Sequence, residues 1–318
     1  MAKLDFFELI FLLKAIDDIE LPPFPSITIR GGLGASFKNL YCVNRKSNSS
    51  CKDCILRFKC PYSLIFDTYI DEIPQDFPFR IKTIPRPFVL YMKDSDDVIK
   101  LGNGDRFKLG ITLIGSASDY FPYLLYAIDN YGKNGVGLKK GKFVIDKIID
   151  SKGNAIYEDN KLMSTDLPAQ SWEPRTEDKI ELNNIESLTI DFISPVRIKS
   201  GRKIRDAFSF EDIIKNLLRR ISLLSYYYCK SKPDINYKAL IKLSKSVEIV
   251  NKNLKWVEYQ RYSGRQKTIL GLGGVKGSIT IEGVLQPFLP FLEIAEKIHI
   301  GKNTTFGFGK ILLKRKGD

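Results

Sequence analysis

Four of the five cysteines in this chain lie close together in the sequence. They are Cys42, Cys51, Cys54 and Cys60, in the spacing C-x8-C-x2-C-x5-C. Four thiolates can complete a tetrahedral zinc site, and a bound ion would order a polar loop that has too few apolar residues to fold alone. We therefore expect a structural zinc site. An iron–sulfur cluster is the alternative, because proline follows the last cysteine here as it does in ferredoxins.

The single histidine, His299, precedes a glycine-rich segment at residues 301–309. An imidazole transfers protons readily near neutral pH because its ordinary pKa is about 6.5. Missing side chains let a backbone approach a phosphate closely, while lysine, asparagine and threonine add donors. We predict a phosphodiester cradle made of Gly301, Lys302, Asn303, Thr304, Gly307 and Gly309. Tight turns with no ligand are the alternative interpretation.

The chain carries a formal net charge of +13 over 318 residues, which favours a polyanionic partner. Two basic stretches are candidate RNA contacts, although most such runs are simply solvated loops. The first follows a predicted strand and contains Arg197, Lys199, Arg202 and Lys203. The second flanks a predicted hairpin loop and contains Arg261, Arg265 and Lys267. Nucleic acid is therefore the first partner to test.

The elements that would position these residues follow the same order in each half. In the second half, residues 188–192 alternate as a strand does, and apolar residues from 210 to 221 recur at helical spacing. Two hairpin strands at 256–262 and 277–284 follow, with Gly271, Gly273 and Gly274 in the loop between them. A helix at 287–298 and a strand at 308–314 close the half. This order is ferredoxin-like.

The first half repeats that order. Strands are expected at 6–15, 79–91, 106–114 and 142–149, and helices at 26–41 and 121–131. A second glycine-rich segment, 132–141, precedes its last strand, which indicates an internal duplication. We predict an α+β chain of two tandem ferredoxin-like domains, residues 1–186 with the cysteine-rich loop 42–60 and residues 187–318 with the loop 301–309.

Several classes of protein are excluded or disfavoured. Both glycine loops precede a strand, whereas P-loops and dinucleotide-binding loops precede a helix. The longest apolar runs are too short to span a bilayer, and no cleavage site follows the first of them, so we expect a cytoplasmic protein with no membrane partner.

The ordered motifs resemble those of the CRISPR repeat-processing endoribonucleases of the RAMP superfamily. The resemblance covers nearly the whole chain. Three C-terminal segments carry most of it: RYSGRQ at 261–266, GGVKGSI at 273–279 and IHIGKNTTFGFGK at 298–310. Residues 21–24, 29–34, 107–115 and 192–198 add to it. The resemblance implies binding of the repeat in precursor CRISPR RNA and metal-independent cleavage of one phosphodiester, with no cofactor needed for catalysis.

The resemblance also implies a histidine near the first helix of the N-terminal domain, and this chain has none there. The candidates for acid–base chemistry are therefore His299, beside the second glycine loop, and Lys38 and Tyr41, on the first helix. A structural histidine and a solvated lysine are the alternative interpretations of these residues.

Three functional hypotheses follow from the sequence. The first is a repeat-processing endoribonuclease whose products end in a 2',3'-cyclic phosphate and a 5'-hydroxyl. The second is a non-catalytic RAMP-type RNA-binding subunit of a CRISPR interference complex, which other effector subunits would join. The third is a general single-stranded nucleic-acid binding protein.

Overall fold

The computed structural model describes residues 3–45, 51–69, 73–74, 77–164, 166–174, 186–200, 203–204, 208–232, 234–263 and 268–315. The chain divides into two compact units. The N-terminal unit is Asp5–Gln170, and the C-terminal unit is Ser171–Asp318 together with Met1–Leu4. The division falls at residue 170, before the boundary at 186 that the sequence predicts.

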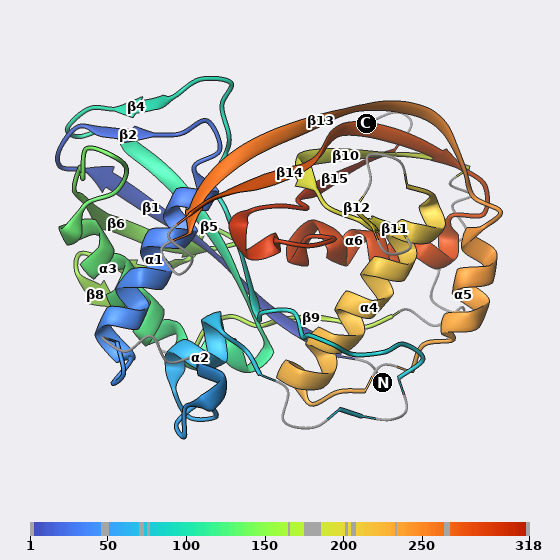
Figure 1. Ribbon diagram of the computed structural model, residues 1–318, viewed down its shortest axis with the longest axis horizontal. Helices are drawn as coiled ribbons and strands as arrows, with labels where there is room; N and C mark the ends of the chain where they lie inside the picture. Colours follow the sequence, from blue (N-terminus) through green and yellow to red (C-terminus); the bar gives the residue numbers. More distant parts are fainter. Residues whose placement is uncertain are drawn as a thin grey trace. The chain divides into compact units, whose positions relative to one another are not determined.

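The N-terminal unit has the ferredoxin-like order (Figure 1). Its sheet contains β3 (Phe88–Tyr91), β5 (Arg106–Ile114), β1 (Leu4–Ala15) and β6 (Phe143–Asp150), side by side in that order, and each neighbouring pair is antiparallel. The helices are α1 (Ser26–Tyr41) and α3 (Phe121–Asn134). One buried apolar cluster joins both helices to these strands.

The strand predicted at 106–114 is confirmed as β5, and its first four residues alternate: Phe107 and Leu109 are buried, while Arg106 and Lys108 are exposed. The helices α1 and α3 are held together by polar contacts as well as apolar ones, because Ser36 Oγ donates a hydrogen bond to the carbonyl oxygen of Ala127 at 2.9 Å. The long helix α1, which carries the predicted catalytic residues, is therefore fixed firmly in its unit.

The C-terminal unit repeats the fold. Its sheet contains β13 (Glu248–Ser263), β14 (Thr268–Glu282), β10 (Ser187–Val196) and β15 (Ile311–Arg315), again in that order and antiparallel. The helices are α4 (Phe210–Cys229) and α6 (Leu289–Ile298). The amphipathic α4 begins with a capping box, in which Ser209 and Asp212 satisfy each other's backbone amides. Two ferredoxin-like units in tandem are therefore confirmed.

The predicted hairpin of the C-terminal unit was wrong in its bounds. β13 and β14 are much longer than expected and form the two long curved strands of Figure 1, and Gly271, Gly273 and Gly274 lie within β14 rather than in a loop. A Cβ at Gly273 would collide with the side chains of Trp256 and Glu258. Gly271 and Gly273 therefore leave room for side chains of β13, and Gly274 leaves room for Pro195, Val196 and Phe308.

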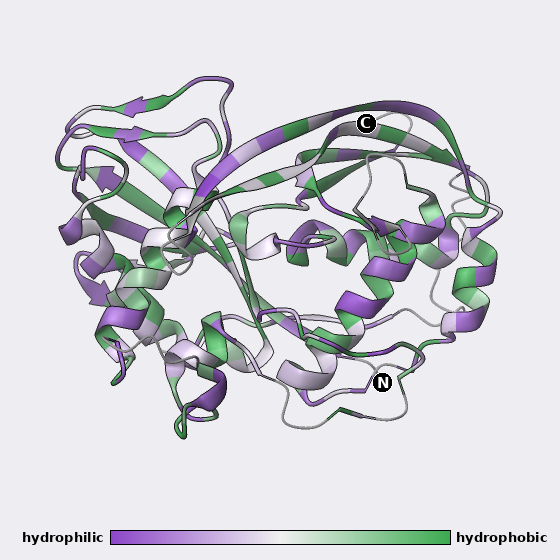
Figure 2. Ribbon diagram, viewed as in Figure 1, coloured by the Kyte–Doolittle hydropathy of each residue, from purple (hydrophilic) through white to green (hydrophobic). Residues whose placement is uncertain are grey.

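Both units also contain shorter helices and strands. In the N-terminal unit they are β2 (Ile19–Leu21), α2 (Pro61–Phe66), β4 (Ile99–Leu101), β7 (Ala155–Glu158), β8 (Lys161–Leu162) and the 3-10 turns Cys51–Asp53 and Gly115–Tyr120. The strand β9 (Gln170–Trp172) lies at the division. In the C-terminal unit they are β11 (Lys199–Ser200), β12 (Lys203–Ile204), α5 (Tyr237–Ser244) and the 3-10 turns Gln286–Phe288 and Thr304–Phe306. The hydropathy colours of Figure 2 show α4 and β13 alternating between polar and apolar residues.

The glycine loop 301–309 is fastened to the end of β10. The amide of Lys302 donates to the carbonyl oxygen of Arg197 at 3.0 Å, and the amide of Gly309 donates to that of Pro195 at 2.9 Å. Gly309 has a φ of 78°, and a Cβ there would collide with the carbonyl of Ile300. Only glycine meets both conditions without strain.

We expect Gly309→Ala to lower the free energy of unfolding of the C-terminal unit by about 2 kcal/mol or more, since a left-handed backbone and a backbone collision both oppose the added methyl group. Both tryptophans, Trp172 and Trp256, belong to this unit, so urea unfolding followed by tryptophan fluorescence reports on it. The matched control is Gly31→Ala in α1, where no atom lies within 4 Å of the position that the added Cβ would take. Because both tryptophans lie in the other unit, the unfolding of this control is followed by far-UV circular dichroism. That change should stabilise by about 0.5 to 1 kcal/mol, and equal effects of the two substitutions would contradict the packing argument.

Candidate nucleic-acid interface

Four positive side chains of the C-terminal unit gather beside the glycine loop. Lys302 belongs to the loop, Arg197 and Lys199 follow β10, and Arg219 lies on α4. The pKa of the Lys302 ammonium is lowered by loss of hydration and then by the charges of Lys199, Arg197 and Arg219. We call these four residues the cation cluster. Like charges held this close repel one another, and a bound anion would relieve that repulsion.

Arg197 is the most constrained member of the cation cluster. Its Nη1 donates a hydrogen bond to the carbonyl oxygen of Gly273 at 2.7 Å, while its buried Nε has no hydrogen-bond partner among the described residues. Partial burial lowers the pKa of the Arg197 guanidinium, and the nearby carboxylate of Glu258 opposes that effect. The guanidinium is thus positioned by β14 and keeps unused donor capacity for a ligand.

The glycine loop also contacts the β13–β14 hairpin. The guanidinium of Arg261 lies over the ring of Phe306, with 4.7 Å between its Cζ atom and the ring centroid. Five residues earlier on β13, the half-exposed Trp256 donates its indole N–H to Glu258 at 2.9 Å. The predicted RNA-binding residue Arg261 and the predicted loop are therefore neighbours, which their separation in the sequence does not reveal.

Part of the predicted phosphate cradle does not reach the surface. Lys302 is exposed, and Gly301 and Asn303 are half-buried, but Thr304, Gly307 and Gly309 are buried. Their backbone conformation and packing serve the turn itself, which is the alternative interpretation for these three positions. Of the predicted cradle, Gly301, Lys302 and Asn303 are therefore the residues that remain accessible.

Some predicted contacts lie outside the described residues. These are Arg202, Arg265 and Lys267. Lys203 is part of β12, but the placement of its side chain is not described. Conversely, the sequence analysis missed Arg219 as a ligand candidate, although its position off the apolar stripe of α4 was a usable signal.

His299 is an interior residue. It ends α6 with a φ of 59°, it is only 2% exposed, and its Nδ1 lies 3.0 Å from the carbonyl oxygen of Phe308. Burial, followed by the charge of Lys310, lowers the pKa of the imidazole to about 3. A neutral, enclosed imidazole cannot reach a phosphodiester from this position, so the geometry argues against His299 as the group that transfers a proton to substrate.

The two candidates on α1 are closer to the surface. Tyr41 donates its hydroxyl proton to the carbonyl oxygen of Tyr123 at 3.0 Å, and its ring packs edge-on against Phe37. Burial, with smaller contributions from Tyr126 and Tyr123, raises the pKa of Tyr41 to about 12. The half-buried Lys38 lies one turn earlier, with its Nζ 6.0 Å from the ring centroid of Tyr62. Tyr41 is therefore a proton donor at neutral pH and not a base.

The four clustered cysteines all line one cavity of about 170 Å³ between α1 and α2. All four are free and half-buried, and Arg57 and Lys59 line the same cavity. In the part of the chain that the structure describes, no three His, Cys, Asp or Glu side chains converge closely enough to hold a metal ion as they lie. The predicted metal site is therefore not confirmed.

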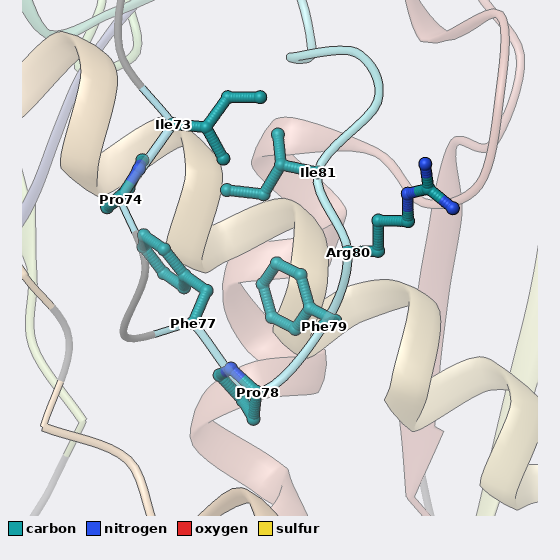
Figure 3. Close-up of a pocket in the computed structure, with 7 residues that line it drawn as sticks. All are labelled: Ile73, Pro74, Phe77, Pro78, Phe79, Arg80 and Ile81. Carbon is teal, nitrogen blue, oxygen red and sulfur yellow. The ribbon is translucent and has the colours of Figure 1, made fainter.

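A second hollow lies in the segment that follows α2 (Figure 3). It has a volume of about 490 Å³ and is lined by apolar side chains and one arginine, namely Ile73, Pro74, Phe77, Pro78, Phe79, Arg80 and Ile81. The rings of Phe77 and Phe79 are 5.3 Å apart, and Arg80 points away from them. The sequence analysis missed this segment.

No helix within the described ranges is both long and apolar enough to cross a membrane.

Comparison with protein families gives two matches that together cover most of the chain. Residues 4–169 match a family model called AF_1859_N, described as an N-terminal domain. Residues 190–311 match the CRISPR-associated endoribonuclease Cas6. None of the curated proteins matches the chain.

Solved structures share the fold. The chain is similar to Thermus thermophilus Cas6, with 14% identity, a TM-score of 0.55, and coverage of 99% of this chain and 100% of that one. A Cas6 product complex gives 15% identity, a TM-score of 0.54, and coverage of 97% and 99%.

A partial Cas6-RT-Cas1–Cas2 complex gives 14% identity and a TM-score of 0.60 over 99% of this chain. The chain spans about half, 47%, of the protein that it matches in that complex. The AF_1859_N model matches more than half of the chain, so the chain belongs to the family that this N-terminal domain defines, and its residues 190–311 are similar to the Cas6 endoribonuclease.

Proposed function

We propose that the protein is an endoribonuclease that binds the repeat of precursor CRISPR RNA and cleaves it to release guide RNAs. The observation that carries this proposal is the cation cluster beside the glycine loop, within the region that matches the Cas6 family. A surface of mutually repelling cations is suited to a phosphate backbone. Similar proteins also occur with other CRISPR proteins, as in the Cas6-RT-Cas1–Cas2 complex, and we propose such partners here.

We propose that cleavage proceeds by metal-independent acid–base chemistry. The 2'-oxygen attacks the adjacent phosphorus and the bond from phosphorus to the 5'-oxygen breaks, which leaves a 2',3'-cyclic phosphate and a 5'-hydroxyl. A base takes the proton of the 2'-hydroxyl, an acid gives one to the 5'-oxygen, and cations stabilise the charged phosphorane.

The residues on α1 suit two of these roles. Tyr41 keeps its proton at neutral pH, so it suits the role of the general acid. Its hydroxyl would turn from the carbonyl oxygen of Tyr123 to the leaving 5'-oxygen. Lys38 lies one helical turn away, and its ammonium group suits the role of the cation that stabilises the phosphorane. His299 fits a positioning role, because it joins the end of α6 to the glycine loop.

The cation cluster should control the dependence of RNA affinity on salt. We expect Lys302→Ala, Lys199→Ala and Arg219→Ala each to weaken binding and to reduce the slope of log affinity against log salt by about 0.7 to 0.9, since each removes one phosphate contact. Fluorescence anisotropy with labelled repeat RNA at several salt concentrations measures this slope. The control is Lys242→Ala, an exposed lysine on α5. Slopes that match the control in all three variants would show that the cluster does not bind the RNA backbone.

The products distinguish the functional alternatives. We expect repeat RNA incubated with the protein in EDTA to yield one cut, with a 2',3'-cyclic phosphate on the 5' fragment and a 5'-hydroxyl on the 3' fragment. Denaturing gels before and after phosphatase or kinase treatment identify these ends. Cleavage that requires added magnesium would overturn the acid–base proposal. Binding of the repeat without cleavage would favour the RNA-binding subunit, and equal binding of a scrambled strand would favour the general single-strand binder.

The catalytic assignment has its own test. We expect Lys38→Ala and Tyr41→Phe each to slow single-turnover cleavage about 100-fold, with little loss of RNA affinity. Tyr126→Phe is the matched control, because Tyr126 is an exposed neighbour of Tyr41. The pH–rate profile should show no inflection near pH 6.5 that depends on His299, whose pKa is about 3.

The variant His299→Asn tests the alternative, because the asparagine amide can donate to the carbonyl oxygen of Phe308 in place of Nδ1 but cannot transfer a proton. We expect this variant to cleave within a few-fold of the wild type. If it is folded by circular dichroism yet cleaves 100-fold more slowly, the proton transfer belongs to the C-terminal unit and the assignment to α1 is wrong.

A further inference from the structure

The cysteine-rich segment is organised around one cavity by local turns. The amide of Cys54 donates to the carbonyl oxygen of Cys51 at 3.1 Å, and the amide of Cys60 donates to that of Leu56 at 2.8 Å. Cys42 follows the last residue of α1, and Cys60 precedes the first residue of α2. The chain thus brings four thiols to the wall of a single cavity of about 170 Å³.

The described part of this segment has no apolar core to hold it in place. None of the described residues of 42–60 is buried. The large apolar side chains point outward instead: Val43 is 73% exposed and Ile55 is 93% exposed. A segment of this composition gains too little from burial to offset the conformational entropy lost on ordering, so another interaction must stabilise it.

We propose that Cys42, Cys51, Cys54 and Cys60 together bind one Zn²⁺ ion. Four sulfur ligands and no carboxylate or imidazole is the donor set of a closed structural zinc site. As they lie, the sulfurs do not converge closely enough to hold an ion. Because no buried side chain anchors the described residues of 42–60, a local adjustment of the turns can bring the sulfurs together without disturbing the core of the unit.

The surroundings of the cavity suit the charge of such a centre. Zinc with four thiolates carries a net charge of about −2, and the cationic side chains of Arg57 and Lys59 line the same cavity. The side-chain amide of Asn44 lies 3.9 Å from the Cys54 sulfur and can donate an N–H···S hydrogen bond to it. Each thiol that becomes a ligand releases one proton to solvent when it binds the ion.

The proposed zinc site lies between the two helices α1 and α2 of the N-terminal unit. A shared ion would connect the C-terminal end of α1 to the N-terminal end of α2. The end of α1 carries Lys38 and Tyr41, so zinc would restrain the helical turn on which those side chains lie. This inference is independent of the proposed cleavage reaction, since it concerns the ligands alone.

Metal analysis of the full-length protein tests the site directly. We expect purified protein from zinc-supplemented cells to hold one zinc per chain by mass spectrometry of the metal. Protein stripped by a chelator should take up one Co²⁺ with the visible absorbance of tetrahedral thiolate coordination. We expect Cys54→Ser to lose the zinc and that absorbance, whereas Cys229→Ser, the cysteine on α4, should keep both.

The wild-type measurements need no variant to fold, so the proposal stays testable if Cys54→Ser is unstable. Iron and inorganic sulfide in anaerobically purified protein would overturn the zinc assignment in favour of a cluster. Reduced protein that holds neither zinc nor iron, and that takes up no Co²⁺, would overturn the metal site altogether. Zinc retained by a folded Cys54→Ser protein would place the ion elsewhere.

Discussion

The hydrogen bonds between the end of β10 and the glycine loop determine most of what the C-terminal unit can do. They join Pro195 and Arg197 to Gly309 and Lys302, and they require left-handed backbone at Gly301 and Gly309. A Cβ at either glycine would collide with a backbone carbonyl. The same close approach brings the Lys302 side chain to Arg197 and Lys199, so the backbone contact creates the cation cluster. It also encloses His299 beneath the loop.

Lys302 differs in its surroundings from Lys314 and Lys215 of the same unit. Lys314 is paired with Asp191 at 2.6 Å, and Lys215 with Glu211 at 2.7 Å, so those lysines have their partners within the fold. In the cluster the neighbours of Lys302 are positive, and its pKa is lowered by loss of hydration and then by their repulsion. Repulsion of this kind lowers the stability of the free protein, and the lost stability is recovered when an anion binds. The glycines that support it cannot be exchanged without a cost in folding, which links the stability of the loop to the capacity of the surface to bind RNA.

The helix α1 has a comparable place in the N-terminal unit. Ser36 and Gly32 hold it against α3, because the serine bonds to a carbonyl of α3 and the glycine leaves room for the ring of Tyr131. This fixes the direction in which Lys38 and Tyr41 project. The cysteine-rich segment begins at the residue after the helix ends. Order in that segment and the position of the candidate catalytic turn are therefore coupled through the chain itself.

The sequence by itself determined the order of the strands and helices, because the period of apolar residues is local information. It predicted α1 at its observed bounds, the strand β5 and both ferredoxin-like units, and its motifs agree with the Cas6 match of residues 190–311. It did not determine which side chains are accessible. His299 and the glycines of 307 and 309 look like parts of a site in the sequence, yet the fold buries them.

Arg219 and Arg220 show why only the tertiary structure could decide this. They are adjacent in the sequence and point in directions about 100° apart on the helix. Arg220 is buried and donates two hydrogen bonds to the carbonyl oxygen of Ile298, at 3.0 and 2.8 Å, while Arg219 joins the cation cluster. The helical period places Arg219 opposite the apolar stripe and Arg220 at its edge, but whether each faces solvent, a helix end or other cations depends on segments about eighty residues away. Those long-range contacts, and not the local pattern, assign one arginine to the fold and the other to the candidate site.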